Sequence, residues 1–308
     1  MLYLTESDVR ALLPMRQAID LMQAAFERLA RGEAINQPRR RLILPTGSVL
    51  HYMAASDGNY FGAKVYSTNK LSGAHFLFLL YRASDGSPLS LIEANHLGQI
   101  RTGAVSGLAT KYLARPDAAT LGLIGSGFQA RSQFEAMLAV RPIRQAKLWS
   151  RDPAKRSSFE AVRDAQIVVT ATNAKDPVLD ADWIAGGTHI NAMGSNQANR
   201  KELPAELIHR SSRIVVDSLE QARMESGDLL LALDESGWKD SKIVELKDVA
   251  TTPQPAEWRP DQITIFKSNG LAVEDVICAG YVYERAIESK RGVEVLTPEH
   301  AGTRGQPQ

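Results

Sequence analysis

The chain has few of the features that mark secreted, metal-binding or nucleic-acid-binding proteins. Its one cysteine, Cys278, can form no internal disulfide and fits a reducing cytosol. The six histidines show no HxH, HExxH or paired-cysteine spacing, so no metal site is expected. The 36 Lys and Arg residues nearly balance the 35 Asp and Glu residues, which gives no support for a nucleic-acid partner.

Long apolar stretches are also missing. No run reaches the length of a membrane span, so no membrane partner is expected. The first residues, Met1–Ser7, lack the basic start and apolar stretch of a signal peptide, which predicts a cytoplasmic location. What the chain does have is 308 residues with 44% hydrophobic side chains, enough for two domains with ordinary cores.

The pattern of the sequence changes near residue 115. Before it, a helix over residues 5–31 precedes short strands with tight turns and a helix over 95–114, which favours an antiparallel sheet. After it, apolar runs alternate with helical stretches, and a last helix spans 271–289, which favours a parallel α/β sheet buried on both faces. The predicted strands are Val49–Ala54, Tyr60–Thr68, His75–Arg82 and Pro88–Glu93, followed by Thr120–Ile124, Ala146–Trp149, Gln166–Ala171, Thr188–Met193, Arg213–Asp217 and Ile263–Phe266.

A glycine-rich turn follows the strand predicted at 120–124 and opens a helix predicted over 130–140. Gly125 permits a tight turn, Gly127 lets the backbone approach a pyrophosphate, and Ala130 still allows close helix–strand packing. Free N–H groups and the helix dipole favour phosphates there. In this context the turn predicts a nicotinamide-dinucleotide site rather than an ordinary strand-to-helix turn. Its residues are Gly125, Ser126, Gly127, Phe128, Gln129 and Ala130.

The end of the next strand bears on the choice of cofactor. NAD-type sites usually place Asp or Glu there, but Asp152 comes one position too late. Ser150 could donate to a ribose 2′-phosphate, and Arg151 could pair with it, with Lys155 nearby. NADP(H) is therefore predicted in preference to NAD(H), which stays possible if Arg151 is only a solvated surface charge.

Several stretches agree in order and spacing with one known family. They are the glycine turn, Gln37–Arg40, Phe61–Lys64, Ile100–Ala104, Ile167–Thr172, Asn191–Asn196, Glu202–Leu203 and Lys267–Ala272. On these motifs the chain resembles the ornithine cyclodeaminase/mu-crystallin family over nearly its whole length. The resemblance implies an α/β homodimer with an α+β substrate-binding and dimerisation domain, residues 1–115 and 270–308. Residues 116–269 would form the Rossmann-type dinucleotide-binding domain.

The family holds the α-carboxylate of its substrate with cationic residues, which by position resemble Arg40, Lys64 and Arg101. A carboxylate in a dry pocket needs paired cations, and an inward-facing lysine such as Lys64 is uncommon unless paired. Arg39 and Arg41 leave the register around Arg40 ambiguous. Surface charges or internal ion pairs are the alternative interpretation for all three.

Two positions depart from the cyclodeaminases. Asn196 stands where they carry an acid/base Asp, and an amide cannot accept and return a proton, so it favours simple hydride transfer and could hold a water or the imine N–H. His51 stands where they carry a Glu. It is either a partly exposed strand residue or a pocket residue that donates to substrate or shuttles a proton, with a pKa near neutrality. The Gly-Ser-Asn pattern at 194–196 resembles the family's cyclic-ketimine reductases.

The resemblance therefore implies NAD(P)H-dependent reduction of Δ1-pyrroline-2-carboxylate or Δ1-piperideine-2-carboxylate to proline or pipecolate. Lys64, Arg101, Asn196 and His51 would be the catalytic group. The nicotinamide side is expected to involve Thr170, Ala171, Thr172, Met193 and Gly194. Thr102 would bond the cofactor phosphates or support Arg101, and Asp275 would lie in the site or on a helix surface. The alternatives are an alanine or arginine dehydrogenase, an ornithine cyclodeaminase, and a protein that binds NADPH without turnover.

The dinucleotide-binding domain looks shortened between residues 151 and 165. The family fits a helix, a strand and another helix there, whereas residues 154–165 supply one crossover helix, the minimum for a parallel connection. One strand and one helix on the adenine side are therefore expected to be missing, unless the sequence omits a segment. We expect weaker cofactor binding or a fragile domain edge, and an unchanged reaction.

Overall fold

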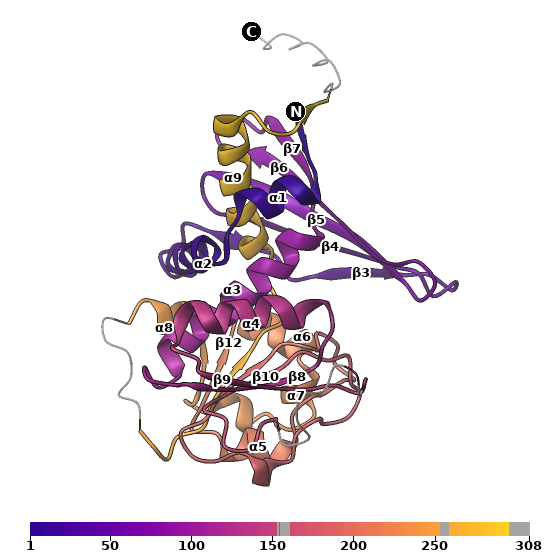
Figure 1. The fold of residues 1–308 in the computed structure, drawn as a ribbon. Coiled ribbons are helices and arrows are strands. Elements are labelled where there is room, and N and C mark those ends of the chain that lie inside the picture. Colours follow the sequence, from indigo (N-terminus) through magenta and orange to yellow (C-terminus); the bar gives the residue numbers. More distant parts are fainter. Residues whose placement is uncertain (153, 155–160, 253–258, 296–308) are drawn as a thin grey trace.

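The computed structural model describes residues 1–152, 154, 161–252 and 259–295, and Figure 1 shows their arrangement. They form two sheets. The mixed sheet has eight strands in the order β15-β1-β7-β6-β5-β4-β2, with β3 beside β4. The parallel sheet has seven strands in the order β13-β12-β14-β11-β10-β8-β9. The predicted α/β class with a parallel-sheet part and an α+β part is confirmed. No described helix is both long and apolar enough to span a membrane.

The mixed sheet contains the four strands predicted for the first part of the chain, and these pair antiparallel as expected. They are β4 (Val49–Ser56), β5 (Tyr60–Asn69), β6 (Gly73–Arg82) and β7 (Pro88–Glu93). Four short strands that the sequence did not predict complete it: β1 (Leu2–Leu4), β2 (Ile35–Asn36), β3 (Arg40–Ile43) and β15 (Val293–Glu294). Strands this short contain too few residues for an alternation of apolar and polar side chains to be recognised in the sequence.

The two faces of the mixed sheet differ. Side chains of its inner face, such as Met53, Phe78 and Ile92, are buried in the core that α2 and α9 share, and each contributes about 1.5–3 kcal/mol. The period-two alternation of the strands turns their neighbours to the outer face. There Tyr52 and Leu77 are 47% and 43% exposed. The outer face is thus apolar although no described helix covers it (Figure 1).

The helix predicted over residues 5–31 is wrong as a single element. The structure has α1 (Glu6–Leu12) and α2 (Met15–Ala30), separated at Pro14. Proline has no N–H and clashes with the preceding turn, so it starts a new helix rather than continuing the old one. The other long helices are α3 (Asn95–Leu113) and α9 (Ala272–Ser289), which agree with the predicted ranges. Helix α3 is buried on nearly every side between the two sheets (Figure 1).

The parallel sheet contains the six predicted strands and one more. The additional strand is β13, which lies between residues 217 and 263, where the sequence predicted no strand. The strands are β8 (Thr120–Ile124), β9 (Gln145–Trp149), β10 (Ile167–Thr170), β11 (His189–Ala192), β12 (Arg213–Val216), β13 (Ile243–Glu245) and β14 (Thr264–Lys267). Its helices are α4 (Phe128–Val140), α5 (Ala205–Arg210), α6 (Leu219–Glu225), α7 (Gly227–Leu230) and α8 (Leu246–Ala250).

The strand order of the parallel sheet indicates where a ligand-binding crevice lies. From β8 the chain goes to β9 on one side and then to β10 on the other, so the carboxyl ends of β8 and β10 flank a topological switch point. Strand β9 pairs with β8 alone among the described strands, as expected if an outer strand is missing. Half of the helix predicted over 154–165 falls outside the described residues, as do Lys155 and residues 296–308; in the described half, residues 161–164 form bends and a turn.

Candidate active site

Two cavities meet between the sheets. The cationic cavity, of about 400 Å³, is lined by Arg39, Lys64 and Arg101 among others. The glycine-turn cavity, of about 610 Å³, lies at the carboxyl ends of β8, β9 and β10. Both are lined by the same four residues at their junction, so they form one continuous cleft. These residues are Phe128, Gln129, Met193 and Gly194.

The glycine turn has the geometry that a dinucleotide requires. Gly125 has φ +109°, and a Cβ there would lie 2.4 Å from the carbonyl oxygen of Ala171, so only glycine fits. At Gly127, the N-cap of α4, a Cβ would meet nothing within 4 Å, so the backbone faces open space in the cavity. Helix α4 begins at Phe128, two residues before the predicted start. Its first N–H groups are therefore available to an anion at the turn.

Most of the predicted cofactor residues line the glycine-turn cavity. They are Gly125, Ser126, Gly127, Phe128, Gln129, Ser150, Arg151, Ala171, Thr172, Met193 and Gly194. Ala130 is buried behind the turn in the first turn of α4, where its role is packing. At the ribose end, the hydroxyls of Ser126 and Ser150 lie 2.7 Å apart, and Arg151 Nη2 donates to Asn173 Oδ1 over 3.2 Å.

Thr170 is fully buried and lines neither cavity, and its hydroxyl contacts Glu202, a buried residue to which the sequence assigned no role. Glu202 accepts hydrogen bonds from the Thr170 hydroxyl at 2.9 Å, from Thr172 N–H at 2.7 Å and from Gly194 N–H at 2.7 Å. Burial raises the pKa of Glu202, although Lys267 opposes the shift. A Cβ at Gly194 would lie 2.1 Å from the Thr172 carbonyl oxygen, so this close approach of the β10 and β11 loops requires glycine.

The cationic cavity is built from three elements that the sequence separates widely. Lys64 projects from the inner face of β5, and its Nζ donates to Asp275 Oδ1 at 2.9 Å. Arg101 on α3 donates to the same oxygen through Nε at 3.0 Å and to Glu274 Oε2 through Nη1 at 2.8 Å. Asp275 and Glu274 are fully buried in α9, so the interpretation of Asp275 as a surface carboxylate is wrong. The sequence missed Glu274 altogether.

The electrostatics of this cluster follow from its burial. Burial lowers the pKa of Lys64 to about 8, partly offset by Asp275. Burial also raises the pKa of Glu274 to about 8 despite the neighbouring Arg101. For Arg101, burial acts to lower the pKa, but Asp275 and Glu274 outweigh it and raise the pKa. Burial would raise the pKa of Asp275, yet Arg101 and Lys64 hold it below the usual range.

The structure places Arg39, and not Arg40, at the cavity. Arg40 pairs with Tyr52 in the β3–β4 ladder and is exposed, as Tyr52 is, on the outer face. Arg39, one residue earlier, turns inward, is 5% exposed and lines the cationic cavity. A shift of one residue in an extended segment reverses the face, and three consecutive arginines hide this register. The geometry therefore argues against the prediction for Arg40.

His51 lines the cavity but does not have the predicted pKa near neutrality. Its ring stacks on Tyr66 at 4.2 Å, its Nε2 lies 3.0 Å from the Thr68 hydroxyl, and its buried Nδ1 has no partner in the described part of the chain. Burial, together with Arg41 and Arg39, lowers the pKa of His51 to about 4. The ring is thus neutral at pH 7, where it has one N–H donor and one acceptor nitrogen but lacks the acidic second proton of the imidazolium form.

Asn196 and Thr102 also line the cationic cavity. The backbone oxygen of Asn196 accepts a hydrogen bond from Arg41 Nη2 at 2.9 Å, and the residue is only partly buried. The Thr102 hydroxyl donates to the Gly98 carbonyl at 2.6 Å, within α3. Gly98 itself leaves room for Lys64, because a Cβ there would lie 2.8 Å from Lys64 Nζ.

Comparison with known proteins gives the family of the chain. The Ornithine cyclodeaminase/mu-crystallin family matches the chain over residues 1–161 and 154–290. The chain belongs to this family. The resemblance predicted from the motifs is confirmed.

Three relatives of this family member match almost end to end. The Δ1-pyrroline-2-carboxylate reductase of Bacillus cereus is 35% identical, covering 96% of this chain and 99% of the relative. The structure of the Thermococcus litoralis Δ1-pyrroline-2-carboxylate reductase in complex with NADH and L-proline matches with a TM-score of 0.90 and 33% identity, covering 96% and 100%. An archaeal alanine dehydrogenase dimer with bound NAD matches with a TM-score of 0.88 and 31% identity, covering 96% and 99%.

The comparisons also bear on the shortened segment. The family matches in two pieces that overlap at residues 154–161, which is where the sequence analysis places the missing elements. The alignment with the Bacillus cereus enzyme spans 331 positions, more than the 308 residues of this chain. The relative therefore carries residues that this chain lacks.

Proposed function

We propose that this protein reduces a cyclic imino acid, Δ1-pyrroline-2-carboxylate or its six-membered homologue, to the L-amino acid with a reduced nicotinamide cofactor. The observation that carries the proposal is the continuity of the cleft. Cations for a carboxylate line one end, the glycine turn lies at the other, and Met193 and Gly194 lie where they join. The relative that matches in complex with NADH and L-proline supports this choice of ligands.

The charge balance of the cationic cavity favours an anionic substrate. Among the described residues, the three cations that line the cavity, Arg39, Lys64 and Arg101, form ion pairs with Glu225, Glu274 and Asp275. Because burial raises the pKa of Glu274 to about 8, Glu274 is mostly protonated at neutral pH, and the cluster then has an excess positive charge. An excess charge in a buried cluster is stabilised by a counter-charge, which the carboxylate of an imino acid supplies.

In the proposed reaction, the main contribution of the protein is to position the substrate. When bound, the nicotinamide supplies the hydride for the C=N carbon. Arg39, Lys64 and Arg101 hold the carboxylate and so fix the distance and angle of that carbon, which contributes much of the rate. The nitrogen is best reduced as the protonated iminium, and Lys64, whose pKa is lowered to about 8, holds a proton beside it at neutral pH. Asn196 carries no acid/base group, which agrees with the absence of a deamination step.

A direct assay tests the proposal. The protein is mixed with NADPH or NADH and Δ1-pyrroline-2-carboxylate, and the absorbance of the reduced cofactor is followed. We expect the absorbance to fall and L-proline to form. Ammonia release from L-ornithine would indicate a cyclodeaminase instead, reduction of NAD⁺ with L-alanine would indicate a dehydrogenase, and tight ligand binding without any turnover would indicate a binding protein.

Affinity for the carboxylate should depend on pH through Lys64. Lys64 is cationic below a pKa of about 8 and neutral above it, so affinity is expected to fall as the pH rises through 8, by up to about tenfold per pH unit. The probe is pyrrole-2-carboxylate, a planar five-membered ring with the same carboxylate and no reducible C=N bond, measured by calorimetry. Arginine stays charged at these pH values, so K64R should reduce the decline to the part caused by Glu274, which gains a negative charge beside Arg101 over the same pH range. The same decline in K64R would show that another group titrates.

We further propose a preference for NADPH over NADH. Ser150 and Arg151 line the cavity where a ribose 2′-phosphate would lie, and the nearby carboxylate, Asp152, comes after them. R151A should weaken NADPH binding about tenfold and leave NADH binding nearly unchanged, as fluorescence titration would measure. Equal losses for both cofactors would remove Arg151 from the recognition of the phosphate. Because an outer strand beyond β9 is expected to be missing, both cofactors should bind more weakly than they bind the longer relatives.

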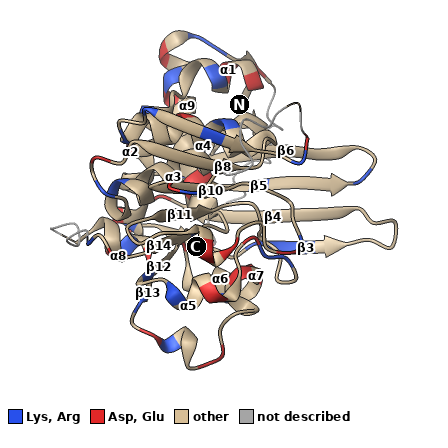
Figure 2. Ribbon diagram, turned by 60° about the horizontal axis from the view of Figure 1, so that its bottom comes forward, with Lys and Arg blue, Asp and Glu red and all other residues tan. Residues whose placement is uncertain are grey.

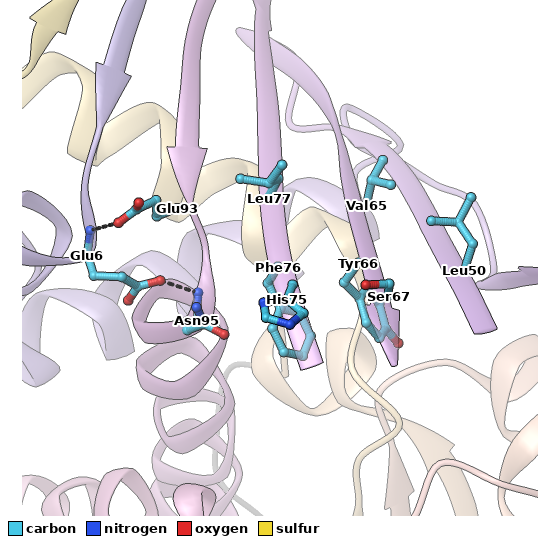
Figure 3. A pocket seen from close by; sticks show the side chains of 10 residues that line it. All are labelled: Glu6, Leu50, Val65, Tyr66, Ser67, His75, Phe76, Leu77, Glu93 and Asn95. Atoms are coloured by element: carbon cyan, nitrogen blue, oxygen red, sulfur yellow. Dashed lines mark hydrogen bonds between the residues drawn. The ribbon is translucent and has the colours of Figure 1, made fainter. Parts of the chain in front are cut away.

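The outer face of the mixed sheet is proposed as the interface of a homodimer. Leu50, Val65 and Leu77 lie in a row across β4, β5 and β6, beside a groove that reaches Glu6 and Glu93 (Figure 3). The three strands are almost free of charged residues (Figure 2). An uncovered apolar face of this kind is typical of protein–protein contacts, and a two-fold axis would let it bind its own copy. The archaeal alanine dehydrogenase relative is a dimer.

Charges placed on that face should dissociate the dimer. F61D and L77D put a carboxylate on each of two exposed apolar positions, which are 38% and 43% exposed. Burying an unpaired charge in an interface is costly, so light scattering should report half the wild-type mass. L138D is the matched control, since Leu138 is 46% exposed on α4 and away from this sheet. Equal masses for all four proteins would place the interface elsewhere or show a monomer.

A further inference from the structure

An ion-pair cluster beside the cationic cavity includes Arg39, which holds the carboxylate in the proposed reaction, and two residues that have no role in that reaction. It joins Arg39 and Arg41, on either side of the start of β3, to Glu225 at the end of α6. We propose that Glu225 is a positioning residue, which orients Arg39 for the substrate carboxylate and fastens the mixed sheet to the dinucleotide-binding part across the cleft. The inference rests on the proposed function, because it names how that carboxylate site is assembled.

Glu225 is saturated with hydrogen-bond donors. It is 3% exposed. Its Oε1 accepts from Arg39 Nη1 and from Gln221 Nε2, the latter at 2.6 Å, and its Oε2 accepts from Arg41 Nη2 at 2.6 Å. Charge-assisted bonds of this kind are short and strongly directional, and burial removes the competition from water. Glu225 therefore fixes the guanidinium plane of Arg39 rather than merely neutralising its charge.

The remaining contacts of Arg39 show which of its nitrogens is left for a ligand. Nη2 donates to the carbonyl oxygens of Asn269 at 2.9 Å and Gly270 at 3.3 Å. Gln221 Nε2 donates to the same Gly270 oxygen at 2.8 Å, which closes a ring of contacts through Glu225. Nε of Arg39 is buried and has no partner among the described residues. Arg39 lines the cationic cavity, so a carboxylate bound there is the acceptor that we propose for this guanidinium.

The cluster also connects separate walls of the cleft. Arg39 and Glu225 are 186 residues apart, and the cationic start of β3 lies next to the acidic segments of α6 and α7 (Figure 2). Arg41 donates to Glu225 and also to the backbone oxygen of Asn196, another residue of the cavity wall. Arg39 reaches the backbone at 269–270. The carboxylate of Glu225 thus fixes the relative positions of three segments of the cavity wall, namely the start of β3, the loop at Asn196 and the backbone at 269–270.

A glutamine at this position would break the arrangement at nearly constant volume. Its amide has one acceptor oxygen and one NH₂ group, whereas three donors converge on the two oxygens of Glu225. At least one donor would then face another donor. Arg39 is expected to rotate out of its orientation, while the rest of α6 keeps its sequence. Glu220, exposed on the same helix, offers a matched control in E220Q.

The test compares wild type, E225Q and E220Q. With Δ1-pyrroline-2-carboxylate, E225Q should raise KM at least about tenfold and change kcat by less than about twofold, because Lys64 and Arg101 still orient the bound substrate and the lost interaction holds the carboxylate equally before and during the reaction. Pyrrole-2-carboxylate should bind about tenfold more weakly by calorimetry, while the dissociation constant of the cofactor and all properties of E220Q stay at wild-type values. Equal losses of cofactor and carboxylate affinity, or no loss of either, would overturn the proposal.

Two further experiments cover the cases in which E225Q does not fold or the wild-type protein shows no activity. If E225Q does not fold, R41Q removes only the partly exposed end of the cluster and should weaken pyrrole-2-carboxylate binding about threefold, again without affecting the cofactor; an unchanged affinity would overturn the proposal. If the wild-type protein reduces no imino acid, the proposed function fails. Calorimetry with pyrrole-2-carboxylate then still decides whether Glu225 positions Arg39.

Discussion

Replacing Arg101 by lysine is expected to lower kcat/KM for Δ1-pyrroline-2-carboxylate by about 10²- to 10³-fold, although the positive charge is retained. Arg101 uses Nε for Asp275 and Nη1 for Glu274, which leaves Nη2 for a ligand. Lysine has a single nitrogen on a flexible stem and cannot serve both carboxylates and the substrate. Losing one partner of a buried, charged hydrogen-bond set costs about 2–5 kcal/mol, and about 1.4 kcal/mol corresponds to a factor of ten.

The loss should be divided between KM and kcat. A carboxylate held less tightly raises KM, and a ring that is no longer aimed at the nicotinamide lowers kcat. R131K, at an exposed arginine on α4, controls for the substitution itself. Thermal unfolding should show that R101K is folded before its kinetics are compared. Wild-type kinetics in R101K would remove Arg101 from the site and leave the carboxylate to Arg39 and Lys64.

The features predicted correctly from the sequence are those whose cause is local. Each residue of the glycine turn has its role because of its own backbone or its nearest neighbours, so strand, turn and helix could be predicted from one short stretch. The four hairpin strands carry period-two alternation and clear turn residues. Pro14 is an exception among the local features, because the periodicity on both sides of it favours one helix, whereas the proline divides the segment into two.

The features that could not be predicted depend on residues far apart in the chain. Three consecutive arginines give no sign of which one turns inward until β3 is paired with β4, and the structure chooses Arg39. From the sequence alone, Asp275 fits a site residue and a surface residue equally well. Its position in the site depends on contacts with Lys64 and Arg101, which lie on other elements. Glu225 carried no local signal at all. Its role exists only where α6 and the start of β3 meet.

Asp275 supports the second large prediction, which concerns stability. Its Oδ1 is shared by Lys64 Nζ and Arg101 Nε, and the carboxylate is fully buried. D275A leaves two buried cations facing each other without the anion between them. Removing one partner from a buried ion pair costs about 3–5 kcal/mol. At about 2–4 °C per kcal/mol for domains of this size, the melting temperature should fall by about 6–20 °C.

Two comparisons separate this electrostatic cause from a simple cavity. D275N keeps the volume and should lose most of the same stability, because the amide brings no charge and its NH₂ group faces donors. The double variant K64M/D275L removes one cation together with the anion and should recover part of the loss, since an apolar replacement of a buried pair is often tolerated. A melting temperature of D275A equal to that of the wild type would contradict the role of Asp275 as the shared anion.

The D275A variant also tests whether ligand binding at the site affects the stability of the protein. Without Asp275, Lys64 loses the group that raises its pKa against burial, so its pKa should fall further below 8 and less of it should be charged at neutral pH. An anion that binds between the remaining cations should then stabilise the folded protein in proportion to its occupancy. Pyrrole-2-carboxylate is expected to raise the melting temperature of D275A, whereas the same ring without its carboxylate is not. Stabilisation by both compounds would mean that the ring, and not the charge, is what the cavity recognises.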